Sequence, residues 1–177
     1  FRRVLFRSEI TLTTHLFVAA ADLGEVRAAT KDLNIDFSEI KCAPIDLAGA
    51  IKNLDFEIVA IHDAQRPLTR STQFHRTLAG LSGFDAVRPT MAFTETLKSL
   101  NEEKRLTQTI DRTKVRRISS PEIIRRSAID FEAQPKGWAL PLLPGARTSE
   151  IEGDPESLRI NSASDVTLME AFLHWQA

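Results

Sequence analysis

The stretch EIVAIHDAQRP, residues 57–67, combines the two features that decide the fold. Four consecutive apolar residues, at positions 58–61, are typical of a β-strand buried on both faces, as in a parallel sheet. The chain then changes character, because a histidine, Asp63, Arg66 and a proline follow at once. In open α/β sheets, ligands bind beyond the carboxyl ends of the strands. The stretch therefore predicts a sheet strand that ends at a candidate binding site.

Asp63 and Arg66 offer two interpretations of this site. The carboxylate can hold a metal ion or a sugar hydroxyl, while the guanidinium can brace that carboxylate or bind a phosphate in fork geometry. The alternative is a structural ion pair that closes a tight loop. The residues by themselves leave both interpretations open.

Strand-like and helix-like segments alternate on both sides of this stretch. The predicted strands are residues 15–20, 39–43 and 56–62, and the predicted helices are residues 22–33, 46–54 and 71–81. This order is typical of a parallel-rich sheet with helices on its faces. We expect Asp22 to cap the first helix, and Phe74, Leu78 and Leu81 to face the core from the third.

Residues 93–110 break the alternation. Thr94, Thr96, Thr107 and Thr109 favour strands on either side of the polar turn NEEK, which predicts a protruding β-hairpin. An isolated two-stranded ribbon is marginal in water, so we expect this arm to pair with a second copy of the chain.

Two helices are predicted after the arm. Residues 120–129 predict a helix that Ser120 caps and that has a proline in its first turn. Residues 131–147 are rich in Pro and Gly and predict irregular structure. The last helix is predicted at residues 165–174, with Ser162 and Asp165 forming a capping-box-like start. Its core-facing stripe would consist of Val166, Met169, Phe172 and Leu173.

The composition argues against several classes of protein. The 23 basic and 24 acidic side chains nearly cancel, which argues against a general nucleic-acid or membrane-surface protein. No apolar run approaches the length of a membrane helix. Cys42 has no partner for an internal disulfide, which favours a reducing, cytoplasmic compartment. The four histidines have no zinc-ligand spacing. A chain of 177 residues suits one domain.

The segment KVRRISSPEIIRR, residues 114–126, concentrates positive charge. A nucleic-acid patch is one interpretation, but no aromatic residues are interleaved with the basic ones. A solvated or phosphate-facing surface is the better interpretation.

Several ordered blocks resemble the 2-C-methyl-D-erythritol 4-phosphate cytidylyltransferases. HDAQRP resembles the family's His-Asp-Ala-x-Arg-Pro element, and FTETLK resembles its Val-Thr-Asp-Thr-Leu-Lys block. TIDRTKVRRISSPE resembles its Val-Asp-Arg stretch followed by Thr-Pro-Gln. EIEGDPESLRINSASDVTLMEAFL resembles its closing block, in which a Lys-Ile-Thr strand precedes the last helix.

The resemblance implies a Rossmann-like nucleotidyltransferase sheet flanked by helices, and a homodimer whose arms reach the partner's site. The implied reaction is cytidylyl transfer from CTP to a polyol phosphate with Mg²⁺, in isoprenoid precursor synthesis. It implies that Asp63 faces the nucleotide and metal, with Arg66 beside it. The implied substrate-binding residues are Thr96, Arg112, Ser120 and Arg159, the last in place of the family's lysine.

The chain also departs from the family. Nothing before Asp63 matches the Gly-rich loop that cradles the triphosphate, and APIDLAGAI, residues 43–51, replaces a Gly-Gly-x-x-Arg-x-x-Ser block. We expect an amino-terminal truncation, with residues 1–8 either foreign or an ordinary first strand. We also expect CTP affinity no better than about millimolar for this chain, and no turnover. The functional alternative is a non-catalytic or regulatory relative that keeps the fold and arm.

Overall fold

The computed structural model describes residues 15–19, 23–32, 36–40 and 45–176. The described chain divides into two compact units. The larger unit holds residues 58–124 and 147–176, and the smaller unit holds the described residues up to 57 together with residues 125–146. The prediction of a single domain is not tested by this division and stays a prediction.

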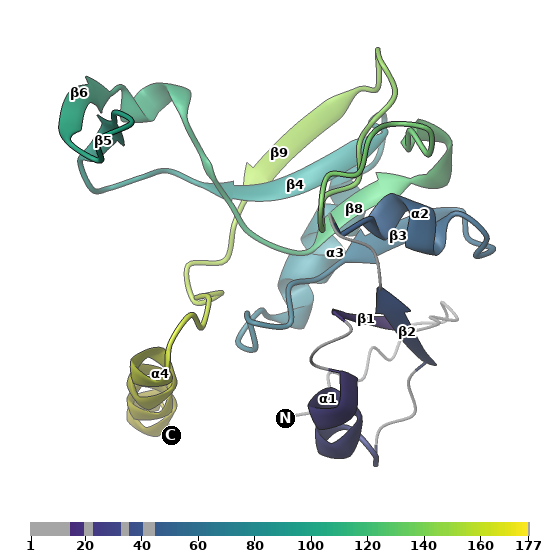
Figure 1. Ribbon diagram of the computed structural model, residues 1–177, viewed down its shortest axis with the longest axis horizontal. Helices are drawn as coiled ribbons and strands as arrows, with labels where there is room; N and C mark the ends of the chain where they lie inside the picture. The colour runs from purple at the N-terminus through teal and green to yellow at the C-terminus, as the bar shows by residue number, and fades with distance from the viewer. Residues whose placement is uncertain (1–14, 20–22, 33–35, 41–44, 177) are drawn as a thin grey trace. The chain divides into compact units, whose positions relative to one another are not determined.

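The elements alternate as expected in the first half of the chain (Figure 1). The smaller unit contains β1 (His15–Ala19), α1 (Leu23–Ala29), β2 (Asp36–Ile40) and α2 (Leu47–Ile51). The larger unit contains β3 (Ile58–Ile61), α3 (Ser71–Gly80), β4 (Ala86–Met91), β5 (Leu97–Leu100), β6 (Leu106–Ile110), η2 (Arg112–Lys114), β7 (Arg117–Ile118), β8 (Glu122–Arg125), β9 (Thr148–Glu152) and α4 (Ala163–Gln176). The short helix η3 (Arg126–Ala128), which follows β8, belongs to the smaller unit.

The smaller unit is built on the parallel pair β1 and β2. Both strands were predicted, although β2 begins at Asp36 and the end of the predicted segment lies outside the described residues. The predicted cap Asp22 lies outside them as well. Helix α2 is shorter than predicted, and the Asp46 carboxylate caps it by accepting a hydrogen bond from the Gly49 N–H at 2.9 Å.

The larger unit is built on a five-stranded sheet in the order β3-β8-β4-β7, with β9 also paired to β4. Strand β4 is parallel to β9 but antiparallel to β7 and β8. The expected mixture of sheet and flanking helices is confirmed, but the prediction that the sheet is mostly parallel is wrong. The difference arises because β7 and β8 pair with β4 in the opposite direction, and none of these three strands was predicted.

Strand β8 replaces the helix predicted at residues 120–129. Ile123 and Ile124 are both buried and lie opposite Val87 and Ala86 of β4. Adjacent β-branched residues that are both buried suit a strand covered on its two faces, whereas in a helix they would point in directions 100° apart. The predicted Ser120 cap is therefore absent, because no helix begins there.

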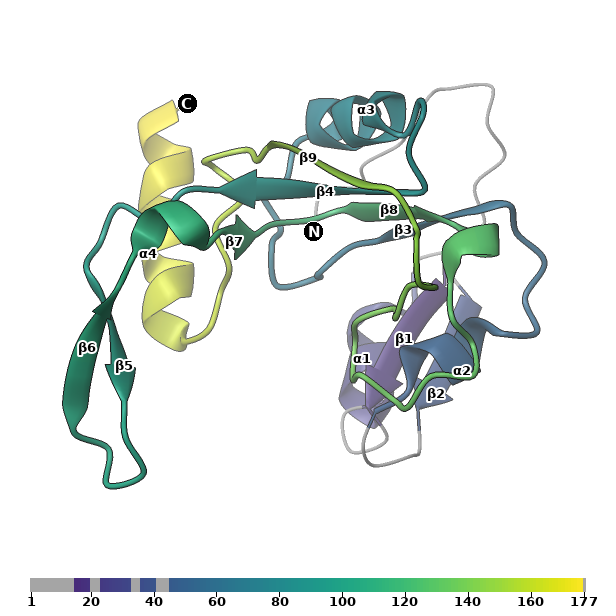
Figure 2. The ribbon, with the colours of Figure 1, turned by 90° about the horizontal axis from the view of Figure 1, so that it is seen from above.

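Helix α3 lies along one face of this sheet (Figure 2). Leu81, Val87 and Ile123 form the buried apolar cluster beneath it. The prediction that Phe74, Leu78 and Leu81 face inward holds fully only for Leu81, since the most buried positions of the helix itself are Gln73 and Thr77. Their polar groups are satisfied: Gln73 Nε2 donates to Thr77 Oγ1, and Thr77 Oγ1 to the Gln73 carbonyl.

Strand β3 lies at one end of the strand order. Ile58 and Ala60 are exposed, while Val59 and Ile61 are half-buried. The prediction of a strand buried on both faces is therefore wrong for β3. A terminal position leaves one face and one edge of a strand less covered than a central position does.

The predicted hairpin arm is confirmed, since β5 and β6 pair antiparallel with Leu97 opposite Ile110. Its turn is closed by the Asn101 side chain, whose Oδ1 accepts a hydrogen bond from the Arg105 N–H at 2.9 Å. Leu100 and Leu106, opposite each other near the turn, are 58% and 72% exposed. The hairpin stands apart from the sheet (Figure 1), which leaves these two side chains in water.

Helix α4 confirms the predicted last helix with slightly wider bounds, and the predicted capping box is present. The Asp165 carboxylate accepts hydrogen bonds from the N–H groups of Asn161 and Ser162, and the Asp165 N–H donates to Ser162 Oγ. The predicted core-facing stripe is only partly correct, because Met169 is buried whereas Val166 and Leu173 are exposed. Among the described residues, no helix is both long and apolar enough to cross a membrane.

Candidate functional site

The site begins in the turn that follows β3. The Asp63 carbonyl accepts a hydrogen bond from the Arg66 N–H at 2.9 Å, and Asp63 Oδ1 accepts one from the Gln65 N–H at 3.0 Å. An aspartate that bonds the backbone two residues ahead holds a tight turn in place. The turn brings Arg66 Nε to 3.6 Å from Asp63 Oδ2, so the two residues form the ion pair that the structural interpretation expected, while the binding role stays a prediction.

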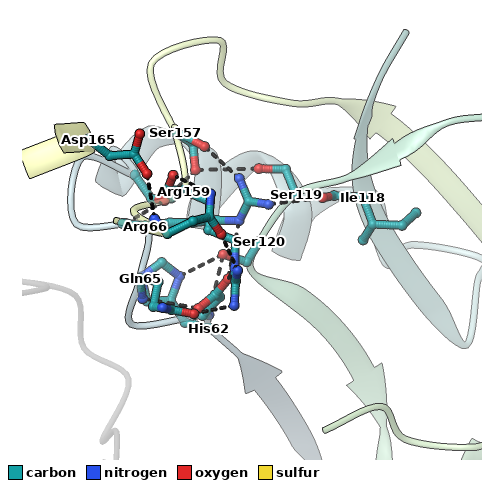
Figure 3. Close-up of polar contacts among 12 residues, drawn as sticks. His62, Gln65, Arg66, Ile118, Ser119, Ser120, Ser157, Arg159 and Asp165 are labelled. Carbon is teal, nitrogen blue, oxygen red and sulfur yellow. Dashed lines mark hydrogen bonds and ion pairs between the residues drawn. The ribbon is translucent and has the colours of Figure 1, made fainter. Parts of the chain in front are cut away.

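Arg66 is held on several sides (Figure 3). Its Nη1 donates to the Ser157 carbonyl at 2.7 Å, and its Nη2 to the Ile118 carbonyl at 3.3 Å. Burial lowers the pKa of Arg66, while the Asp63 carboxylate opposes this shift. A guanidinium remains charged at neutral pH nonetheless. The turn after β3 thus presents a fixed, partly desolvated cation.

Buried hydroxyl groups hold the Arg66 turn in place by hydrogen bonds. Thr69 Oγ1 lies 2.6 Å from Ser157 Oγ and also donates to the Arg66 carbonyl at 3.0 Å. Ser119 Oγ lies 3.4 Å from the same Ser157 hydroxyl. All three hydroxyl-bearing residues are buried. These contacts fix the segment after β9 against the turn after β3.

Arg159 completes the cluster from the segment before α4. Its Nε donates to Asp63 Oδ2 at 2.9 Å, and its other nitrogens contact the side-chain oxygens of Gln65 and Asn161. The Ile160 N–H donates to the Gln65 carbonyl at 2.8 Å. Asp63 therefore lies between two guanidinium groups, of which that of Arg159 is the more exposed.

Ser120 links His62 to the same turn (Figure 3). Its Oγ accepts a hydrogen bond from the Asp63 N–H at 3.4 Å and lies 3.0 Å from His62 Nδ1. The Ser120 hydroxyl and the His62 ring can each donate in this contact, depending on the imidazole tautomer. Burial lowers the pKa of His62, an effect opposed by Asp63 and reinforced by Arg66. The centre of the His62 ring lies 5.2 Å from the centre of the Phe74 ring.

The remaining predicted residues lie at the base of the arm. Thr96 and Arg112 are both exposed, and Arg112 Nη1 donates to the Thr94 carbonyl. No contact among the described residues joins Thr96 or Arg112 to Asp63 or Arg66. The structure therefore brings together Asp63, Arg66, Ser120 and Arg159, while the roles of Thr96 and Arg112 stay predictions.

Several residues of this cluster were not predicted from the sequence. Gln65, Ser157 and Asn161 carry no pattern that distinguishes them from ordinary loop residues. His62 was considered as a zinc ligand and was set aside for its spacing. Its position directly before Asp63 was the available signal.

The fit of this cluster to magnesium depends on Asp63. Within the described part of the chain, no group of three or more His, Cys, Asp or Glu side chains could hold a metal ion. Both Asp63 oxygens accept hydrogen bonds from other residues. Mg²⁺ is nevertheless often held by one or two carboxylates together with substrate phosphates. One carboxylate at this position is compatible with a metal that arrives with a nucleotide.

Apart from the Asp63 cluster, a hollow of about 600 Å³ in the smaller unit is a candidate site. Its Arg126 guanidinium lies 4.7 Å from the ring centre of Phe56 and 5.0 Å from that of Phe131. The same guanidinium donates to the carbonyls of Leu54 and Lys52. These contacts engage Arg126 in holding its own unit together, so this hollow is a weaker candidate than the Asp63 cluster.

Solved structures of 2-C-methyl-D-erythritol 4-phosphate cytidylyltransferases share this fold. One is a crystal structure of 2-C-methyl-D-erythritol 4-phosphate cytidylyltransferase from Thermus thermophilus, with a TM-score of 0.66 and 18% identity, over 92% of this chain and 98% of that one. The predicted fold class is therefore confirmed.

The family model of 2-C-methyl-D-erythritol 4-phosphate cytidylyltransferase matches residues 46–175, and the chain belongs to this family. Two curated relatives of that name come from Saccharopolyspora erythraea, 27% identical over 128 residues, and Rhodococcus opacus, 31% identical over 127 residues. Each match covers 67% of this chain and 56% of the relative. The chain thus spans about half the length of these relatives.

Proposed function

We propose that this protein, contrary to the expectation of no turnover drawn from its missing Gly-rich loop, transfers a cytidylyl group from CTP to 2-C-methyl-D-erythritol 4-phosphate, in the synthesis of isoprenoid precursors. The observation that carries the proposal is the cluster of Asp63, Arg66 and Arg159 at the end of β3, in a chain of this family. A phosphate acceptor and a nucleotide are both anions, and this cluster offers cations at the position where α/β sheets bind ligands. The named relatives give no support to the non-catalytic alternative.

The proposed step is a displacement at phosphorus. A phosphate oxygen of the acceptor attacks the α-phosphorus of CTP, the bond from that phosphorus to the bridging oxygen breaks, and pyrophosphate leaves. Such transfers depend on positioning and charge neutralisation more than on covalent chemistry from the protein. Arg66 and Arg159 would neutralise phosphate oxygens, while Asp63 holds both guanidinium groups in place.

Magnesium would be held by Asp63 and would supply further neutralisation of the triphosphate charge. Ser120 and His62 would keep the backbone of the Asp63 turn fixed during the step. The roles of Ser120 and His62 follow from two contacts of Ser120 Oγ, one with the Asp63 N–H and one with the His62 ring.

We also propose a cytoplasmic homodimer in which the arm of one copy, with Thr96 and Arg112 at its base, reaches the site of the other. The exposed Leu100 and Leu106 support this proposal, because burying them against a second copy would remove apolar surface from water. In such a dimer, Arg112 would bind the acceptor phosphate.

The test separates acceptor binding from turnover. Calorimetry with 2-C-methyl-D-erythritol 4-phosphate measures binding, and pyrophosphate release with CTP, Mg²⁺ and the acceptor measures turnover. Asp63→Asn and Arg66→Gln should reduce both, whereas Lys52→Gln, in the other unit, should not. Failure to bind the acceptor, or equal signals from the parent and the Arg66→Gln variant, would contradict the proposal.

A further inference from the structure

Arg117 directly precedes a residue that contacts Arg66, and its charge acts on the Arg66 guanidinium. It belongs to β7, where it lies opposite Met91 of β4. The next residue, Ile118, provides the carbonyl that accepts a hydrogen bond from Arg66 Nη2. The backbone of β7 therefore already forms one wall of the Arg66 environment.

The two neighbouring arginines of this segment lie on different faces. Arg116 and Ile118 line a hollow of about 310 Å³ together with Thr90 and Glu150, and Arg116 Nε lies 3.7 Å from a Glu150 carboxylate oxygen. Successive side chains of a strand point to opposite faces, so Arg117 points away from this hollow. Its Nη2 instead contacts Met91 Sδ at 3.1 Å.

The contacts of Arg117 leave its charge without a direct counter-ion. Thioether sulfur is a weak acceptor, and no carboxylate in the described part of the chain forms an ion pair with Arg117. Arg117 and Arg159 both act electrostatically on Arg66, and both lower its pKa after the larger effect of burial. Arg117 also acts electrostatically on the carboxylate of Glu95, an exposed residue at the base of the arm, but this effect is weak.

The charges around Arg66 thus do not balance. Arg66, Arg117 and Arg159 contribute positive charge, and Asp63 is the carboxylate that pairs directly with two of them. Clustered guanidinium groups repel one another, and an anion with several oxygen acceptors relieves that repulsion by charge-assisted hydrogen bonds. Phosphate esters and diphosphates carry such oxygens.

We propose that Arg117 is a further anion-binding residue of this site, where it joins Arg66 and Arg159 in holding a phosphate or diphosphate group of a substrate. The proposal rests on the proposed function, because that function supplies the phosphorylated ligands. It goes beyond that function by assigning a residue to which the family resemblance gives no role.

The test compares Arg117→Gln with Arg116→Gln, a variant of the neighbouring residue on the other face. Calorimetry uses inorganic pyrophosphate for the nucleotide side and 2-C-methyl-D-erythritol 4-phosphate for the acceptor side. Arg117→Gln should lower the affinity for at least one of these ligands by about five- to thirty-fold. Arg116→Gln should leave both affinities within about twofold of the parent's. Arg117→Lys should recover part of the loss, and thermal melting should show that all variants fold.

Two further measurements make the outcome decisive. Glu95→Gln should strengthen binding slightly, because it removes the carboxylate that competes with the ligand. The effect of Arg117→Gln should also shrink as the salt concentration rises. Equal affinities for the Arg117→Gln and Arg116→Gln variants, or no binding of either ligand to the parent, would overturn the proposal.

Failure of the proposed function gives a different result. In that case the parent would bind inorganic pyrophosphate in an Arg117-dependent way but would neither prefer the polyol phosphate to inorganic phosphate nor release pyrophosphate from CTP. The anion-binding role of Arg117 would then stand for another phosphorylated ligand. Conversely, turnover that is unaffected by Arg117→Gln would support the proposed function and overturn the role of Arg117.

Discussion

Arg159 Nε donates a hydrogen bond to Asp63 Oδ2 across 2.9 Å, although 96 positions separate the two residues in the chain. The same carboxylate oxygen lies 3.6 Å from Arg66 Nε, only three positions away. One carboxylate thus orients a nearby guanidinium and a distant one. This shared position makes Asp63 the residue on which the geometry of the site depends.

Asp63→Asn should reduce turnover by roughly a hundredfold or more, because a neutral amide lacks the charge that pairs with the two guanidinium groups and attracts a metal ion. The fold should survive, since an asparagine oxygen can still accept the Gln65 N–H that closes the turn. Pyrophosphate release and thermal melting measure the two effects. Unchanged magnesium-dependent nucleotide binding would contradict the assignment of Asp63.

Arg66→Ala should destabilise the chain by about 1–3 kcal/mol, because the Ser157 and Ile118 carbonyls lose their donor. Arg159→Ala is the matched comparison. Its guanidinium is more exposed, so the loss should stay below about 1 kcal/mol. Urea unfolding measures both free energies, and equal losses would show that Arg66 is not the structural centre of the turn.

Arg112→Ala should weaken acceptor binding by roughly 10- to 150-fold, in line with the loss of one charge-assisted hydrogen bond to phosphate. Arg112 is exposed and donates to the Thr94 carbonyl, so folding should change little. Lys114→Ala, in the same turn, is the control because it removes equal charge. Similar affinities for the two variants would place the acceptor elsewhere.

The pKa of His62 lies below its ordinary value of 6.5, chiefly because of burial. The unfolded chain therefore binds more protons than the folded chain just below pH 6.5, and folding stability falls as the pH drops through this range. His62→Gln should reduce that slope. Urea unfolding at a series of pH values from neutral downward checks this, and an identical slope in the variant would refute it.

Leu106→Lys should shift the protein from dimer to monomer if the arm pairs with a second copy, because it introduces a charge into an apolar contact. Glu102→Lys, in the turn of the same hairpin, adds positive charge without removing apolar surface and serves as the control. Sedimentation at micromolar concentrations distinguishes the two states. A parent chain that is monomeric at high micromolar concentration would argue against the dimer.

The sequence by itself determined the features that depend on neighbouring residues. Asp63 and Arg66 were predicted as a pair at a strand end, since one turn brings them together. The hairpin at residues 93–110 and the capping box of Ser162 and Asp165 were predicted for the same reason. Such features form from contacts within a few residues, so residue order is enough to specify them.

The tertiary structure alone decided the features that depend on distant partners. Residues 122–125 become a strand because β4 offers Ala86 and Val87 as partners, although a helix cap and a following apolar pair had predicted a helix. The hydrogen bonds of Arg66 to the Ser157 and Ile118 carbonyls likewise join segments that are far apart in the chain. Periodicity and spacing report which face of an element is apolar, but not which element will cover it, because that choice is made by packing across the whole sheet.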